Sequence, residues 1–136
     1  MKLKRTHTCG ELNRDHLGKQ VIINGWVNGW RNLGGVIFID LRDRYGKTQI
    51  RFAPDQKELY QVGKSLRSEY VLAISGTVLG RPVEAINPEM KTGEIEVDVE
   101  EVEILNKSRT TPFEIKDFLD VLTQYEILPN QNLAYH

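Results

Sequence analysis

Several residue types and patterns are scarce in this 136-residue chain, and each scarcity excludes a class of protein or site. Cys9 is the only cysteine, so no disulfide can form within the chain. The three histidines, His7, His16 and His136, are too scattered for a Cys/His zinc cluster. The absence of a run of about 18 uncharged apolar residues predicts no membrane span, and no apolar stretch follows the basic N-terminus as in a signal peptide. We therefore expect a cytoplasmic protein whose core holds without cross-links.

Neither sign of charge is in excess, since 18 basic side chains stand against 19 acidic ones, but the distribution is uneven. Residues 1–51 carry 10 basic and 4 acidic side chains, and residues 94–120 carry 3 basic and 9 acidic ones. The basic segment is suited to an anionic partner. Alternatively, the two segments are solvated faces that offset each other after folding. With 40% apolar and 27% charged residues, the composition is that of one soluble globular domain.

Three consecutive strands are predicted in the first half of the chain. Residues Gln20–Trp30 are rich in β-branched and aromatic side chains with internal glycines, which predicts a long bent strand. A turn at Asn32–Gly35 leads to Val36–Arg42, and a hairpin connection at Arg44–Lys47 leads to Thr48–Ala53. Both later segments alternate apolar and polar residues, the signature of a strand with one buried face. The expected inward residues are Ile37, Ile39, Leu41, Ile50 and Phe52.

The second half predicts one helix and two strands. Residues Gln56–Arg67 have apolar side chains at helical spacing after Pro54, with Asp55 as the expected N-cap. Strand composition returns at Tyr70–Leu79, and the turn-rich stretch Gly80–Gly93 separates it from a last strand, Glu94–Leu105.

The apolar residues of the last strand change phase, which predicts a β-bulge near Glu100 or Glu101. The order strand-strand-strand-helix-strand-strand favours an all-β fold, the five-stranded Greek-key barrel with one helix called the OB-fold, over other small β-barrels. OB-folds often bind single-stranded nucleic acid on their second and third strands.

Phe38 is the one aromatic residue on the expected outward face of those two strands. An outward aromatic ring can stack on a base, and the amide of Gln49 beside it can both donate to and accept from a base edge. Alternatively, a loop covers Phe38. The remaining outward residues are Asp40, Arg42 and Arg51.

Arginines in this region have two interpretations. Arg31, Arg42 and Arg51 are suited to RNA phosphates, or each pairs with Asp40 or Asp43.

Acidic and tryptophan residues complete the candidate list. The alternating acids Glu94, Glu96, Asp98 and Glu100 are typical of an outer strand that resists edge pairing, although Glu96 can also accept hydrogens from a base. Trp26 is expected in the core, on the same face as Trp30 unless the strand bends between them. No catalytic constellation, phosphate-cradling loop or metal motif is present in the sequence.

Four strings, together with Gln49, resemble the N-terminal anticodon-binding domain of bacterial-type aspartyl-tRNA synthetases. They are RTHTCGEL at residues 5–12, NGWV at 24–27, LGGVIFIDLRDR at 33–44 and TGEIEV at 92–97. The first and last are the most particular to this group, and the resemblance covers about residues 5–115. It implies a tRNA-binding OB-fold over residues 1–115 and a hinge or tail at 116–136.

The resemblance also implies roles for individual residues. Phe38 would stack on an anticodon base, and Gln49 would hydrogen-bond the middle uracil. Arg31 would contact the anticodon loop, Glu96 would recognise the first anticodon base, and Arg81 matches a further arginine near the loop. The parent enzyme would be a class II homodimer that joins aspartate to tRNA with ATP and Mg²⁺.

The chain departs from the family at three places, one of which is Leu79, where the family often has an arginine. Asn28-Gly29-Trp30-Arg31 replaces a run of basic residues, which predicts weaker phosphate binding. After residue 115 the sequence differs from the segment that opens the catalytic domain, and the ATP- and aspartate-binding motifs are absent. We therefore expect a monomer with no catalytic residues, cofactor or metal of its own. The alternative is a non-catalytic interaction module in which apolar residues at helical spacing in 118–133 dock a protein partner.

Overall fold

The structure, a computed structural model, describes residues 4–107, and within them it has the predicted five strands and one α-helix. The elements are β1 (Gln20–Leu33), β2 (Val36–Asp43), β3 (Gly46–Phe52), α1 (Lys57–Ser65), β4 (Val71–Gly80) and β5 (Ile95–Asn106). Two short 3₁₀ turns, η1 (Arg14–His16) and η2 (Val83–Ala85), lie before β1 and in the β4–β5 connection.

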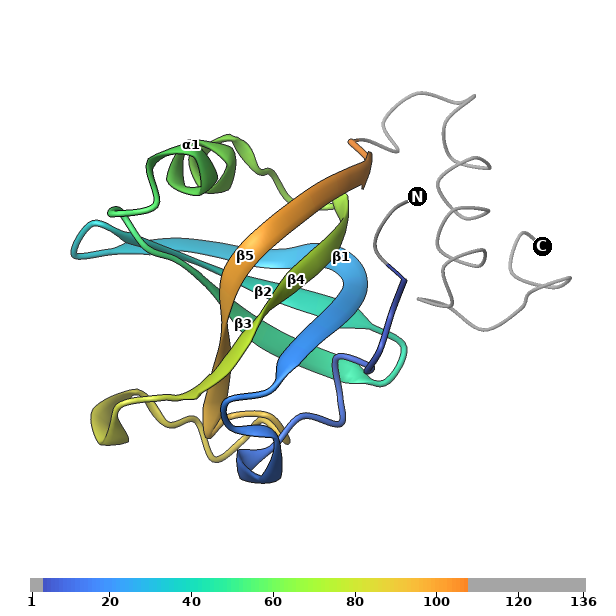
Figure 1. Cartoon of the computed structure of the whole chain (residues 1–136), viewed down its shortest axis with the longest axis vertical. Coiled ribbons are helices and arrows are strands. Elements are labelled where there is room, and N and C mark those ends of the chain that lie inside the picture. Colours follow the sequence, from blue (N-terminus) through green and yellow to red (C-terminus); the bar gives the residue numbers. More distant parts are fainter. Residues whose placement is uncertain (1–3, 108–136) are drawn as a thin grey trace, which may run out of the picture.

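The strands close into a barrel in the order β1-β2-β3-β5-β4 (Figure 1), which confirms the predicted OB-fold. All neighbours are antiparallel except β3 and β5, which run parallel with Ile50 opposite Val97. Strand β1 is long enough to pair twice, first with β4 and then with β2, and Figure 1 shows the strong bend between its halves. The bend was expected from the glycines, and a register shift between Val27 and Gly29 adds a bulge at Asn28.

The barrel interior holds the residues that the alternation predicted. Ile37, Ile39, Leu41, Ile50 and Phe52 are all 0% exposed. Residue Glu100 is the predicted bulge of β5, because Ser75 pairs with Glu101 while Gly76 pairs with Val99. This extra residue brings Val102 back toward the core.

Each end of the barrel is closed by a different segment. At one end α1 packs Gly63 against the ring of Phe52, where an added Cβ would lie 2.8 Å from the ring carbon Cγ. The expected N-cap at Asp55 is wrong, since the cap position is Gln56 and its side chain makes no capping bond. At the other end, the backbone N–H of Cys9 donates to Asp43 at 2.8 Å and the hydroxyl of Thr48 donates to the Cys9 carbonyl at 2.7 Å.

The core position expected for Trp26 is wrong, and the exception allowed for Trp30 applies. Trp26 is partly exposed and lies outside the core, because the inward positions of this half of β1 are Val21, Ile23 and Val27. The bulge at Asn28 then switches the face, so Trp30 pairs with the inward residue Ile39 and does not share a side with Trp26.

The acidic residues of β5 lie on a strand that is paired unequally on its two sides. Strand β5 pairs with β4 from Ile95 to Asn106 but with β3 only at Val97 and Asp98, so protection of its other side by these acids stays a prediction. Glu100 also accepts hydrogen bonds from Gln20 at 2.7 Å and Thr77 at 3.2 Å.

The predictions for residues 108–136, including the domain boundary at 115 and the docking segment, lie outside the described residues. Within the described range, no helix is long and apolar enough to cross a membrane.

Candidate nucleic-acid interface

The outer surface of β1, β2, β3 and β5 carries a continuous set of polar and aromatic side chains, which we call the polar face. Its residues are Arg31, Phe38, Asp40, Gln49, Arg51, Glu96 and Asp98. The strand register sets their order, because directly paired residues project to the same side of a sheet. One row runs Arg31, Phe38, Arg51 and Asp98, and the next contains Asp40, Gln49 and Glu96. Four of the five predicted site residues are thus brought together.

A chain of hydrogen bonds connects the second row. The guanidinium of Arg31 donates to both carboxylate oxygens of Asp40, at 2.9 and 3.2 Å. The same Arg31 donates to Oε1 of Gln49 at 2.9 Å, and Nε2 of Gln49 donates to Glu96 at 2.9 Å. Gln49 and Glu96 are only 8% and 6% exposed, so these bonds lie at the floor of the polar face.

The neighbours of Gln49 determine which way its amide points. An arginine has only donors and a carboxylate has only acceptors, so the amide oxygen must face Arg31 and the amide nitrogen must face Glu96. An amide oxygen accepts two hydrogen bonds and an amide nitrogen donates two. Gln49 therefore retains one acceptor site and one donor of fixed positions after its protein partners are satisfied.

Phe38 is flanked by arginines in its row. It pairs with Arg31 on β1 and Arg51 on β3, and it is partly exposed. Arg51 forms an ion pair with Asp98 at 2.9 Å. In this row Phe38 lies between Arg31 and Arg51, so the ion pair is on the side of Phe38 away from Arg31.

The predicted arginine partners are correct for Arg31 only. Asp43 accepts the backbone N–H groups of Cys9 and Tyr45 and so fixes the β2–β3 turn. Arg42 is exposed and has no ion pair within residues 4–107. Arg51 was not predicted to pair with Asp98, although the alternation of β5 puts Asp98 and Glu96 on the face that Arg51 also shares.

Arg81 differs from the other predicted site residues because it is only 8% exposed. Its Nε donates to the Ile95 carbonyl at 2.9 Å and its Nη1 to the Ala85 carbonyl at 3.2 Å, which ties the β4–β5 connection to β5. Burial lowers the pKa of Arg81 from its ordinary value, and the negative charge of Glu96 acts in the opposite direction. Its predicted contact with RNA stays a prediction.

No group of three or more His, Cys, Asp or Glu side chains placed to hold a metal ion occurs in residues 4–107.

Comparison with known proteins agrees with this arrangement. The family of OB-fold nucleic acid binding domains of the tRNA anticodon type matches residues 21–105, which include the whole polar face. An aspartate–tRNA(Asp/Asn) ligase from Desulfatibacillum aliphaticivorans is 52% identical over 120 residues, which are 88% of this chain and 20% of that protein. An aspartate–tRNA ligase from Staphylococcus carnosus is 50% identical over 115 residues, which are 84% of this chain and 20% of that protein.

A solved structure, the aspartyl-tRNA synthetase from Entamoeba histolytica, has the same fold with a TM-score of 0.68. It is 24% identical, and the match covers 85% of this chain and 24% of that one. The chain thus spans about a fifth of the length of the two curated relatives. These similarities confirm the resemblance seen in the sequence motifs. The barrel is closed and five-stranded, and the family match spans the whole polar face. This chain therefore belongs to the tRNA anticodon-binding family of OB-fold nucleic acid binding domains.

Proposed function

We propose that this chain binds the anticodon loop of aspartate tRNA on the polar face and recognises its bases there. The observation that carries the proposal is the fixed amide of Gln49, which has one donor and one acceptor left for a ligand. The names of the two relatives, an aspartate–tRNA(Asp/Asn) ligase and an aspartate–tRNA ligase, have aspartate tRNA in common, and we take it as the ligand.

The fixed amide suits uracil as the middle base. The pairing edge of uracil offers an N–H donor beside a carbonyl acceptor, which matches the free oxygen and free N–H of Gln49. Cytosine offers a ring nitrogen acceptor and an amino donor in the reverse arrangement. An amide held by Arg31 and Glu96 cannot turn over to suit cytosine without breaking two hydrogen bonds. The preference for uracil thus comes from the network around Gln49 as much as from Gln49 itself.

The other polar-face residues have complementary roles. The ring of Phe38 stacks on a base of the loop, because single-stranded RNA is recognised mostly through unstacked bases on aromatic side chains. Arg31 adds positive charge for the loop phosphates. Glu96, which has acceptor capacity beyond its bond from Gln49, accepts the hydrogens of the first anticodon base, and Arg81 lies near the bound loop.

The remaining family properties belong to a longer protein. In that protein the domain serves a homodimeric class II ligase that attaches aspartate to tRNA with ATP and Mg²⁺. By itself the 136-residue chain binds RNA as a cytoplasmic monomer and performs no chemistry.

The test is a titration of the chain with two labelled anticodon hairpins that differ only in the middle base, uracil or cytosine. We expect tighter binding of the uracil hairpin, and a preference that persists as salt rises, because base contacts carry sequence information while phosphate contacts carry the salt dependence. Equal binding of both hairpins, lost together as salt rises, would contradict base recognition and leave only phosphate attraction.

A further inference from the structure

The hairpin of β1 and β2 has a second exposed surface opposite the polar face, and Trp30 lies on it. The bulge at Asn28 directs Trp30 to the side of α1, where its ring nitrogen donates to the Gly63 carbonyl at 2.9 Å. Trp30 is nevertheless 40% exposed. Because the only polar atom of the indole is already bonded, the exposed part is aromatic carbon held in a fixed position.

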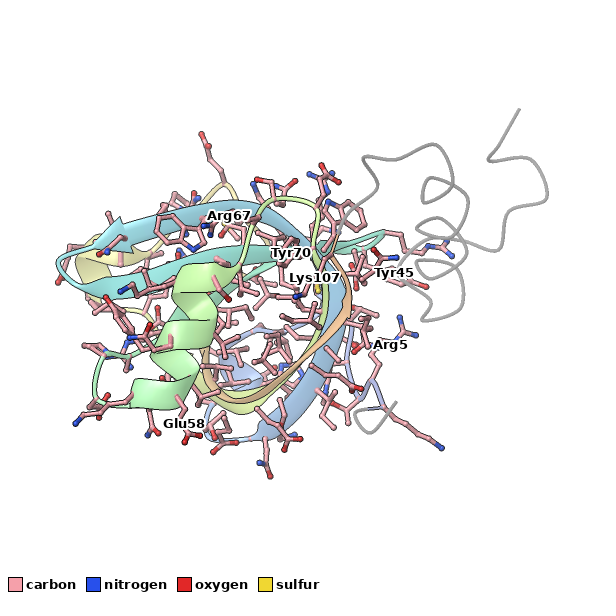
Figure 2. The ribbon with its side chains drawn as sticks, turned by 90° about the horizontal axis from the view of Figure 1, so that it is seen from above. Arg5, Tyr45, Glu58, Arg67, Tyr70 and Lys107 are labelled. Carbon is pink, nitrogen blue, oxygen red and sulfur yellow. The ribbon has the colours of Figure 1, made fainter. Side chains whose placement is uncertain are left out.

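A hollow of about 380 Å³ adjoins Trp30, and we call it the Trp30 hollow. It is lined by Trp30, Lys64, Leu66, Arg67 and Ser68, a set with two cations and no acid. Nη1 of Arg67 donates to the carbonyls of Lys64 and Leu66, at 3.0 and 2.9 Å, and these bonds fix the guanidinium beside the hollow while its other N–H groups stay available. Figure 2 shows Arg67 beyond the end of α1 that lies opposite Glu58.

We propose that the Trp30 hollow binds one nucleotide of the same RNA, with its base stacked on Trp30 and its phosphate beside Lys64 and Arg67. This inference rests on the proposed function, since it extends the RNA beyond the polar face. An exposed aromatic ring with flanking cations is the composition of a stacking site for single-stranded nucleic acid. An apolar peptide would instead need several apolar walls, and Leu66, which is 1% exposed, is the only aliphatic lining residue.

Phe38 on the polar face and the Trp30 hollow are close enough to bind neighbouring nucleotides of one RNA. Arg31, which pairs with Phe38 on the polar face, is the residue after Trp30, and consecutive strand residues point to opposite sides. Strand β1 pairs with β4 only over residues 20–26, so the edge beyond Val27 carries no other strand of the described chain. A nucleotide next to the one stacked on Phe38 can therefore pass Arg31 and that edge to reach Trp30.

The first experiment uses tryptophan fluorescence, because the sequence has only two tryptophans. In the Trp26→Phe variant of the full chain, Trp30 is the sole emitter. We expect its emission to fall as the uracil anticodon hairpin is added, with the same midpoint as the anisotropy of the labelled hairpin. Normal binding by anisotropy with unchanged Trp30 emission would overturn the proposal and leave the hollow to a protein partner.

Two pairs of variants distinguish a loss of base stacking or of phosphate attraction from a general effect of substitution on the fold. Trp30→Ala should weaken hairpin binding by about 5- to 150-fold, the range of one stacked base, whereas Trp30→Phe should stay close to wild type because an aromatic ring remains. Lys64→Gln should lower the slope of log Kobs against log salt by about 1, whereas Lys57→Gln, on the same helix but outside the hollow, should not.

The same measurements distinguish this proposal from the proposed function. The uracil-to-cytosine preference should survive in all four variants, since none touches Gln49. If wild type shows no such preference, base recognition on the polar face fails, whatever Trp30 does. If the preference is present but Trp30→Ala and Lys64→Gln bind like wild type, only the Trp30 hollow fails.

Discussion

The two sides of β2 and β3 have opposite chemistry although they are built from alternate residues of the same strands. On the inside, Ile39 and Ile50 are fully buried and paired with each other. On the outside, Asp40 and Gln49 are paired in the next row and belong to a hydrogen-bonded network. Period-2 alternation thus separates the residues that stabilise the barrel from the residues that face a ligand.

The two sides also differ in what their contacts contribute to stability. Burial of an aliphatic side chain contributes about 1.5–3 kcal/mol. A hydrated ion pair such as Arg51–Asp98 contributes only about 0–1 kcal/mol, because water competes for both charges. Outer contacts can therefore be exchanged for contacts with RNA with little loss of folding stability. We expect substitutions on the inside to lower the free energy of unfolding and substitutions on the outside to lower RNA affinity.

The largest expected effect is on the inside. Ile50→Ala should lower the free energy of unfolding by about 2–5 kcal/mol, through lost burial and the cavity left in the barrel. The neighbouring outward change Arg51→Ala should lower it by less than about 1 kcal/mol. Urea denaturation of both variants measures the contrast. Similar losses at the two positions would show that the outer row is structural after all.

The next effect is on the outside, at Phe38. Phe38→Ala should weaken binding of the uracil hairpin by about 1–3 kcal/mol, roughly 5- to 150-fold, because a base loses its stacking partner. The loss of unfolding free energy should be smaller than for Ile50→Ala, since Phe38 is only partly buried. Fluorescence anisotropy and urea denaturation give the two numbers. Unchanged hairpin affinity would show that no base stacks on this ring.

Much of this contrast is predictable from sequence. Alternation in β2 and β3 identified all five inward residues, and the phase change in β5 identified its bulge, because burial of apolar groups imposes one register on a strand. The faces of Trp26 and Trp30 were not predictable. The faces of both residues depend on a bulge at Asn28. The alternation of apolar residues in β1 shows no shift at this position that would have predicted the bulge.

The hydrogen-bond partners of the polar face depend on pairing between strands that are distant in sequence. Glu96 lies 47 residues after Gln49, and the parallel register of β3 with β5 brings them together. Sequence motifs indicated both residues separately, whereas the fixed amide orientation required the structure.

The third effect concerns Cys9, a thiol of the interior. Burial raises the pKa of Cys9 well above its ordinary value, with the nearby charge of Asp43 acting in the same direction. The folded chain therefore keeps the thiol protonated at a pH where the unfolded chain ionises it. The resulting stability is complete below about pH 8.5 and is lost as pH rises toward the folded-state pKa, by about 1.4 kcal/mol per pH unit.

Cys9→Ala provides the comparison for this prediction, because it removes the thiol and leaves the other titrating groups. The free energy of unfolding of wild type should fall more steeply than that of Cys9→Ala between roughly pH 8 and pH 10. Urea denaturation across this range measures both slopes. Parallel pH profiles would mean that the folded protein lets Cys9 ionise as easily as the unfolded chain.

The smallest expected effect is the most specific, because it changes the choice of base more than the strength of binding. Asp40→Asn removes the charge that holds Arg31 against Gln49, so one of the two hydrogen bonds that fix the amide is weakened and turning the amide over costs less. The preference for uracil over cytosine should fall by about 1 kcal/mol, roughly 5-fold, the size of one hydrogen bond. Asp98→Asn makes the same change of charge on the same face, at the partner of Arg51, and should leave the preference intact. Titration of both hairpins with both variants measures the two ratios. An equal loss of preference in the two variants would mean that net charge sets the choice of base. An unchanged ratio in Asp40→Asn would mean that Arg31 and Glu96 keep the amide in place without the Asp40 carboxylate.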